Sequence, residues 1–199
     1  MNFKIFQDKI VIDRVANELD DFVIRFCDIL NKIRINYVIV SGYVSILFGR
    51  SRLSEDVDLL LEKINFDDFR KLWNSLSGGY ECIQIKAPEI AYQDYLMENT
   101  AIRFCRKGQV IPNFEIKFPK DEIDLWTIEH RQLVLFNKNI LYISPIELQI
   151  PFKLFLGSEK DIEDAKHLYS LLRKYLNIEL LNKFINAFNM NEGFDRYLK

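Results

Sequence analysis

Hydrophobic and polar positions follow two different periods along this chain. From residue 12 to residue 33, apolar side chains recur every three or four positions, which predicts a long amphipathic helix over Ile12–Ile33. The same spacing over Phe66–Leu76 predicts a second helix, which two consecutive glycines end. Apolar runs at Tyr37–Val40 and Asp56–Glu62 predict two strands, with a tight turn and a short helix between them.

The middle of the chain is rich in short β-prone runs. Three of them predict strands, at Tyr80–Lys86, Thr100–Arg106 and Asn113–Phe118. Two more, at Gln132–Asn137 and Ile140–Ile143, predict a hairpin. The segment 89–98 between the first two strands fits either a loop or a short helix.

From Ser144 onward the pattern becomes helical. Ser144, Pro145 and Glu147 have the spacing of a capping box with proline at the first helical position, which predicts a helix to about Leu156. Ser158 and Asn177 are predicted caps of two further helices, which run to about residues 175 and 190. We therefore expect an α+β fold, with a mixed sheet flanked by helices over residues 1–143 and a helical part over residues 144–199.

Composition and charge narrow the classes of protein. The 199 residues carry a net charge of −2, which argues against a surface that coats nucleic acid broadly. No apolar run is long enough for a membrane span, and the first residues lack the apolar core of a secretory signal. The three cysteines lie far apart, as is typical of a reduced compartment. We expect a cytoplasmic protein without a membrane partner.

Candidate chemistry begins with two acids on one strand. Asp56 and Asp58 alternate with Val57 and Leu59, so both carboxylates share a face, about 7 Å apart along the strand at roughly 3.3 Å per residue. Two like charges on one face repel each other unless a cation neutralises them. Mg²⁺ prefers such hard oxygen ligands, and Mn²⁺ is the alternative ion. The pair therefore predicts a metal site at one end of the sheet.

The stretch around these acids resembles a known family. Its elements, in chain order, are Ser41-Gly42, Gly49, Arg52, Ser54 and Asp56-Val57-Asp58. Together with their spacing, they resemble the minimal nucleotidyltransferases of the DNA polymerase β superfamily, closest to the branch that includes AbiEii-type toxins. One departure is Ser41, where many relatives carry glycine. The resemblance implies a triphosphate at the glycine turn and metal at Asp56 and Asp58.

The residues themselves agree with that implication. Gly42 lets the backbone approach a triphosphate closely, and the N-terminus of the following helix favours anions. Arg52 and Ser54 precede the acids and are candidate contacts to phosphate oxygens. The superfamily usually adds a third carboxylate from a later strand, for which Glu115 is our candidate and Asp124 the alternative. Lys117 shares a face with Glu115. It is a candidate to balance phosphate charge, or alternatively to pair with Glu115.

The C-terminal part carries a second resemblance to the same branch, which has a lysine on one helix and a KDxxD element at the start of the next. Here these are Lys153 and Lys160-Asp161-Ile162-Glu163-Asp164. The resemblance implies that Lys153 and Lys160 contact the nucleotide phosphates. It also implies that Asp161 orients a lysine or serves as a base. The alternative is an ordinary charged helix start.

These features predict an enzyme that transfers a nucleoside monophosphate from an NTP to a hydroxyl acceptor, with release of pyrophosphate. The predicted catalytic residues are Asp56, Asp58, Glu115 and Asp161. The acceptor stays open between RNA and protein, as does an antitoxin partner if the protein is a toxin. The alternative function is an inactive module of the same fold that binds a nucleotide or a partner protein.

Overall fold

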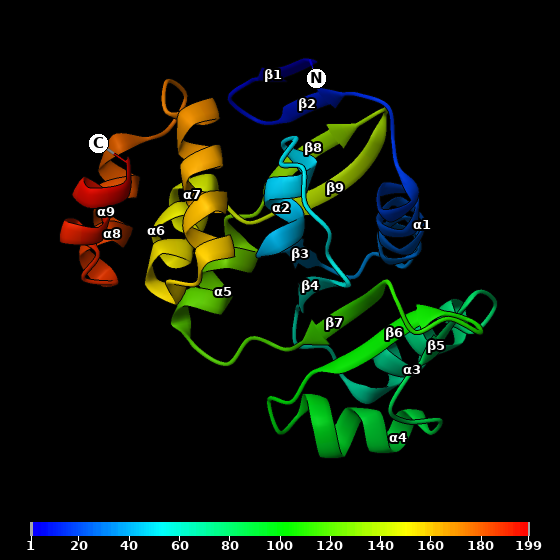
Figure 1. The fold of residues 1–199 in the computed structure, drawn as a ribbon. Coiled ribbons are helices and arrows are strands. Elements are labelled where there is room, and N and C mark those ends of the chain that lie inside the picture. Colours follow the sequence, from blue (N-terminus) through cyan, green and yellow to red (C-terminus); the bar gives the residue numbers. More distant parts are fainter. Residues whose placement is uncertain (1, 199) are drawn as a thin grey trace.

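The computed structural model describes residues 2–198, which form one mixed nine-stranded sheet with helices packed on both of its faces (Figure 1). The strand order is β1-β2-β8-β9-β3-β4-β7-β6-β5. The predicted α+β class, a mixed sheet flanked by helices, is confirmed. The strands are β1 Asn2–Ile5, β2 Ile10–Asp13, β3 Tyr37–Ile39, β4 Asp56–Leu61, β5 Tyr80–Cys82, β6 Ile102–Arg106, β7 Asn113–Lys117, β8 Gln132–Phe136 and β9 Asn139–Ile143.

Helices connect the strands and then form the C-terminal part. The α-helices are α1 Glu18–Ile33, α2 Gly42–Leu47, α3 Phe66–Leu76, α4 Pro88–Ile90, α5 Glu122–Glu129, α6 Ile146–Leu156, α7 Glu159–Leu172, α8 Ile178–Ala187 and α9 Asn191–Leu198. A single π-helical segment, η1 Ala91–Leu96, continues α4. The ambiguous segment 89–98 is therefore mostly helical. Helix α5 had no counterpart among the predicted elements.

The centre of the sheet has two unlike faces. In β4, Val57, Leu59 and Leu61 point into the main core, where the buried side chains of α1 and α3 also lie. On the other face, Leu60 packs with Val38 and with Ile128 of α5. The alternation of strand residues thus places Asp56 and Asp58 on the face of α5, where apolar cover is thin.

The predicted helix over Ile12–Ile33 is wrong in its first part. Residues 10–13 form β2, which pairs in parallel with β8, and α1 starts only at Glu18. Asn17 and Asp20 form a reciprocal capping box there, because the Asn17 side chain accepts from the Asp20 N–H and the Asp20 carboxylate accepts from the Asn17 N–H. Apolar residues of a strand and of the following helix happened to match one helical spacing.

The start of α6 also differs from the prediction. The Ser144 N–H donates to the carbonyl of Ile39 at 3.0 Å, and its hydroxyl accepts from the amide of Gln149. The Glu147 carboxylate accepts from the Asn177 N–H at 2.8 Å. Both members of the predicted capping box therefore bind elsewhere, and α6 starts after Pro145 without a side-chain cap. Packing of an almost entirely buried helix replaces the cap.

Other predicted signals are confirmed. Ser158 and Asn177 cap α7 and α8, although these helices end at Leu172 and Ala187, earlier than predicted, and α9 follows as an extra helix. The hairpin β8–β9 turns through Asn137 and Lys138, whose φ angles of 46° and 71° are those of a two-residue hairpin turn.

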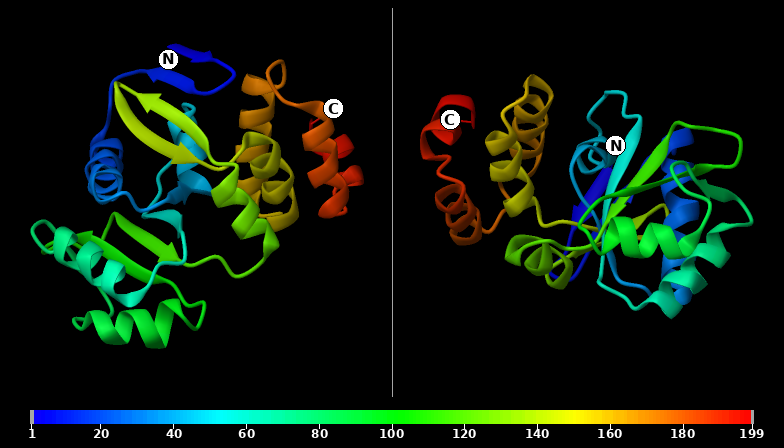
Figure 2. Two further views of the ribbon diagram at one scale, coloured as in Figure 1. Left: turned by 180° about the vertical axis from the view of Figure 1, so that it is seen from behind. Right: turned by 90° about the horizontal axis from the view of Figure 1, so that it is seen from below.

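The helices α6 to α9 gather at one side of the molecule, away from β5, β6 and α3 in all views (Figures 1 and 2). Helix α7 also packs against α2, which follows the Ser41–Gly42 turn. The division of the chain at residue 143 stays a prediction. In the part of the chain that the structure describes, no helix has the length and apolar character to cross a membrane.

Candidate active site

Strand β4 holds Asp56 and Asp58 where it leaves the loop that follows α2. Asp56 is exposed and Asp58 is half-buried, while Val57 and Leu59 between and beyond them are buried. The Ser54 hydroxyl donates to the Asp56 carbonyl at 3.0 Å, which fixes the backbone as it enters the strand. The structure therefore places both acids on one face, with Ser54 beside them.

Asp58 lies in an environment that opposes its negative charge. Burial raises the pKa of its carboxyl above the ordinary value of 3.8, and the nearby Asp56 and Glu115 carboxylates raise this pKa further. A hydrogen bond from the Ser41 side chain and the positive charge of Lys117 lower the pKa, but their effect is smaller. An added cation at this position would relieve the unfavourable charge.

Glu115 lies beside Asp58 on the neighbouring strand. Strands β4 and β7 are parallel, and their register pairs Asp58 with Glu115 and Leu60 with Lys117. The Glu115 carboxylate accepts from the Arg103 guanidinium at 2.7 and 3.1 Å. The structure thus brings Glu115 and Lys117 to the predicted face, where Glu115 is held by an arginine that the sequence analysis did not assign to the site.

The alternative third carboxylate, Asp124, lies on α5 instead of the sheet. Its carboxylate accepts from the Lys120 N–H at 3.1 Å, and burial raises its pKa above the ordinary value. Glu115, in contrast, pairs in register with Asp58 on the neighbouring strand and raises the pKa of Asp58. The geometry therefore favours Glu115 over Asp124 as the neighbour of the two aspartates.

The three carboxylates on this face supply only part of the ligand set for a hard divalent cation. Two carboxylates on one face, one of them with a raised pKa, are suitable ligands for Mg²⁺. Among residues 2–198, however, no three His, Cys, Asp or Glu side chains form a ready-made metal cluster. The reason is visible at Glu115, whose carboxylate is turned to Arg103. Asp56 and Asp58 fit the ion, and Glu115 joins them only if it leaves Arg103.

The turn between β3 and α2 is built around Gly42 and Arg52. A Cβ atom at Gly42 would lie 1.9 Å from a terminal nitrogen of Arg52, so only glycine leaves room for this guanidinium. Ser41 has φ 62° and ψ −133°, a conformation that favours glycine and that costs about 1–3 kcal/mol in other residues. The departure from glycine at Ser41 therefore strains the backbone but supplies the hydrogen bond to Asp58.

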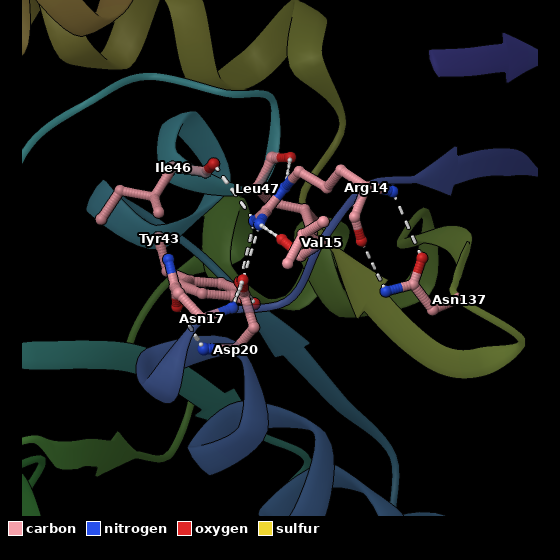
Figure 3. A network of polar contacts seen from close by, with 8 residues as sticks. All are labelled: Arg14, Val15, Asn17, Asp20, Tyr43, Ile46, Leu47 and Asn137. Atoms are coloured by element: carbon pink, nitrogen blue, oxygen red, sulfur yellow. Dashed lines mark hydrogen bonds and ion pairs between the residues drawn. The ribbon is translucent and has the colours of Figure 1, made fainter. Parts of the chain in front are cut away.

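A buried polar network of Arg14, Asp20 and Tyr43 contacts α2 (Figure 3). Arg14 donates to both carboxylate oxygens of Asp20, at 2.6 and 2.8 Å, and the Tyr43 hydroxyl donates to the same carboxylate at 2.8 Å. Arg14 also donates to the carbonyl of Leu47 at the end of α2. Because Tyr43 directly follows Gly42, this network holds the helix whose N-terminus faces the site.

The C-terminal residues of the second motif converge on one buried carboxylate. Asp164, which is fully buried, accepts from Lys153 at 2.8 Å and lies 3.2 Å from Arg52. Arg50 approaches the same carboxylate at 3.6 Å. Lys153 also contacts Asp161 at 3.2 Å. The motif on α6 and α7 is thus joined directly to the loop that carries Arg52.

Lys153, Asp161 and Lys160, to which the sequence assigns roles at the nucleotide, lie in different surroundings. The Lys153 side chain is only 1% exposed and is paired with two aspartates, so a phosphate contact would require those ion pairs to rearrange. Asp161 accepts from Lys153 at 3.2 Å, and its second oxygen accepts from the Ser158 hydroxyl at 2.6 Å, so its role in orienting a lysine or as a base stays a prediction. Lys160 is exposed on the first turn of α7. Its contact with phosphate stays a prediction.

Sequence reasoning missed Arg50, Arg103 and Gln149. Arg50 and Arg103 carried no pattern that separated them from surface arginines. Gln149 had one signal, because it is a polar residue within an almost wholly apolar helical segment. Polar residues that are buried in such a helix need partners, which marks Glu147, Gln149 and Lys153 together.

No protein-family model matches the sequence, and no curated protein is similar enough to match. Among solved structures, an antigenic nucleotidyltransferase-like protein from Paracoccidioides brasiliensis has a TM-score of 0.57 at 16% identity, over 92% of this chain and 95% of that one. The chain has a nucleotidyltransferase-like fold.

A second solved protein has the same fold. The antibiotic-resistance factor ANT(2″)-Ia in complex with adenylyl-2″-tobramycin has a TM-score of 0.52 at 12% identity, over 86% of this chain and 97% of that one. Its solution structure gives 0.53 at 11% identity. The nucleotidyltransferase-like fold therefore extends over nearly the whole chain. The AbiEii-type branch stays a prediction.

Proposed function

We propose that this protein is a Mg²⁺-dependent nucleotidyltransferase that moves a nucleoside monophosphate from an NTP to a hydroxyl acceptor. The observation that carries the proposal is the position of Asp56, Asp58 and Glu115. They lie on one face of the central strands of a nucleotidyltransferase-like fold, beside the Ser41–Gly42 turn. The raised pKa of Asp58 fits a carboxylate that works with a bound cation.

The proposed reaction is an in-line displacement at the α-phosphate. The acceptor oxygen forms a bond to the α-phosphorus, the bond to the β-phosphate breaks, and pyrophosphate leaves with the bonding electrons. A carboxylate on this face, for which Glu115 is the candidate, takes the acceptor proton after release from Arg103. The N-terminus of α2 and Arg52 at Gly42 favour the anionic triphosphate at the turn.

Mg²⁺, or Mn²⁺ in its place, would be held by Asp56 and Asp58 and would neutralise phosphate charge and orient the reacting oxygens. The remaining contributions belong to the chain itself. Ser41 hydrogen-bonds Asp58, Ser54 fixes the entry of β4, and Lys117 adds a positive charge near the acids. Catalysis then rests on positioning and electrostatic stabilisation, without a covalent protein nucleophile.

We propose RNA or protein as the acceptor. A small hydroxyl compound is a further candidate, because a solved structure of the same fold contains one. The complex of ANT(2″)-Ia with adenylyl-2″-tobramycin supports adenylyl transfer to a hydroxyl within this fold. The proposed role as a toxin with an antitoxin partner, and the cytoplasmic location, rest on the sequence alone.

A transfer assay tests the proposal. Purified protein is incubated with Mg²⁺ and each NTP labelled at the α-phosphate, together with total cellular RNA, cellular protein or tobramycin. We expect label to pass to one acceptor class, and we expect Asp58→Ala to abolish it. Asp67→Ala is the matched control, because that aspartate is 75% exposed on α3, and α3 packs on the main-core face of the sheet, opposite the face of Asp56 and Asp58.

The alternative is a module that binds a nucleotide without transferring it. The ion pair between Glu115 and Arg103 favours this alternative, since it occupies the third carboxylate. Calorimetry separates the two functions when it is combined with the transfer assay. Nucleotide binding without label transfer supports the module. No binding of any NTP with Mg²⁺, or binding that Asp56→Ala leaves unchanged, contradicts the enzyme.

A further inference from the structure

A pocket lies next to the carboxylates on the same face of the sheet. It is enclosed by Val40 after β3 and Leu60 of β4 below, and by α5 and Phe152 of α6 above. We call it the α5–α6 pocket. Its volume of about 70 Å³ is several times the roughly 10–15 Å³ that one water requires. This is about half or less of the roughly 150 Å³ of a cavity that holds benzene, so the pocket admits the edge of a ring system and leaves the rest of the ring outside.

The α5–α6 pocket is close to the reacting centre. Leu60 follows Asp58 by two positions on β4, and Lys117 follows Glu115 by two positions on β7, so all four lie on one face. Two positions correspond to about 7 Å along a strand. A nucleotide whose α-phosphate lies at the aspartates could therefore reach the pocket with its base, with the ribose across Leu60 and Lys117.

One polar group in the pocket lacks a partner. Gln149 lines the pocket and is 3% exposed. Its amide nitrogen donates to the Ser144 hydroxyl, and Ser144 is itself held by its backbone bond to Ile39. The other amide atom, Gln149 Oε1, is buried without a hydrogen-bond partner. A buried unpaired carbonyl is unfavourable, which indicates that a donor from a ligand completes it.

We propose that the α5–α6 pocket receives the edge of the nucleobase of the NTP and that Gln149 Oε1 accepts a hydrogen bond from the exocyclic amino group of that base. The inference rests on the proposed function and adds the choice of nucleotide to it. Adenine and cytosine carry an amino group where hypoxanthine and uracil carry a carbonyl oxygen. A carbonyl at this position would face Gln149 Oε1 acceptor to acceptor, so the pocket favours ATP over ITP and CTP over UTP.

The apolar walls suit such a ligand. A base has two apolar faces and a polar edge, and the pocket has apolar side chains from Val40, Leu60 and Phe152 with Gln149 among them. The other polar side chains of the lining already have partners in part. Thr127 donates its hydroxyl to the Ile123 carbonyl, and Asp124 accepts from the Lys120 N–H. Gln149 Oε1 is thus the buried atom that remains to accept a hydrogen bond from the polar edge of the base.

Matched nucleotide pairs test this inference by binding alone. Calorimetry with Mg²⁺ measures the Kd of the α,β-methylene analogues of ATP and ITP, and of CTP and UTP, which differ at the amino position. We expect the amino-bearing member of each pair to bind about tenfold tighter, as expected for one buried hydrogen bond that is replaced by an unpaired carbonyl. Gln149→Ala should remove this difference, while Mg²⁺–tripolyphosphate binds the variant and the wild type alike.

Controls keep the outcomes separate. Gln93→Ala changes an exposed glutamine on η1 and should leave the preference intact. If Gln149→Ala does not fold, the wild-type comparison tests the inference by itself. Equal Kd values within both wild-type pairs, or a preference that survives Gln149→Ala, overturn the inference while the proposed function stands. Failure of every nucleotide and of tripolyphosphate to bind overturns both.

Discussion

Asp20 and Asp58 are two aspartates near α2 whose negative charges meet opposite surroundings. Asp20 is fully buried and is matched by Arg14 and Tyr43, which satisfy both of its oxygens. Asp58 is half-buried next to Asp56 and Glu115, and its pKa is raised first by burial and then by the neighbouring Asp56 carboxylate. The first carboxylate is neutralised within the fold, and the second is left in need of a cation.

This difference distinguishes a carboxylate that stabilises the fold from a carboxylate that is suited to bind a cation. A buried charge that is fully paired stabilises one arrangement of its neighbours, and its loss leaves the partner unpaired. A carboxylate with a raised pKa that lies beside like charges destabilises the empty site and stabilises a bound cation. We therefore expect mutations at Asp20 to affect folding, and mutations at Asp58 to affect activity without loss of stability.

The largest expected effect is at Asp58. Asp58→Asn removes a charge that the site needs, so nucleotidyl transfer should fall by about a thousandfold. The free energy of unfolding should stay the same or rise by about 1 kcal/mol, because the cost of burying the charge and the repulsion with Asp56 both disappear. Label transfer and thermal unfolding measure the two effects. A clear loss of stability would remove the contrast with Asp20.

The next effect is at the supporting network. Asp20→Ala leaves the Arg14 guanidinium buried without its partner and should lower the free energy of unfolding by about 3–5 kcal/mol. Tyr43→Phe removes one hydrogen bond to the same carboxylate and should cost about 1 kcal/mol. Urea unfolding gives both values. Equal effects of the two variants would show that the ion pair contributes little.

A third comparison is between the two aspartates that hold Lys153. Asp164 is fully buried and faces Lys153 and Arg52, so Asp164→Asn should cost about 3 kcal/mol. Asp161 is 20% exposed, and Asp161→Asn should cost about 1 kcal/mol. Hydrogen exchange of α6 and α7 localises the change. If Asp161→Asn were the more harmful variant, Asp161 rather than Asp164 would be the centre of the cluster.

The smallest expected effect is a dependence on pH. The pKa of Asp58 is raised in the folded protein above the ordinary 3.8, so its protonated form is favoured by folding. The stability that the protonated Asp58 carboxyl contributes is fully present below pH 3.8. It is lost as the pH rises through the raised pKa of the folded protein. The stability gained by Asp58→Asn should therefore grow with pH over that interval, which unfolding curves at several pH values measure. A difference independent of pH would contradict the charge argument.

Several parts of the site could be predicted because they depend on local pattern. The alternation in β4 placed Asp56 and Asp58 on one face, and the turn chemistry marked Gly42 and Arg52. The helix over Ile12–Ile33 failed, since the pairing of β2 with β8 joins residues more than a hundred positions apart. The capping box at Ser144 failed because distant partners took both of its side chains.

The sequence by itself determined the acids, the glycine turn, the caps at Ser158 and Asn177, and the α+β class, because each follows from periodicity or from neighbouring residues. Only the tertiary structure decided which side chains lie next to these acids and which buried polar atoms stay unpaired. The register of β4 and β7 set Glu115 beside Asp58, Arg103 occupied Glu115, and the packing of α6 left Gln149 Oε1 unpaired. These relations depend on contacts between residues far apart in the chain, and such contacts leave no periodic signal in one sequence.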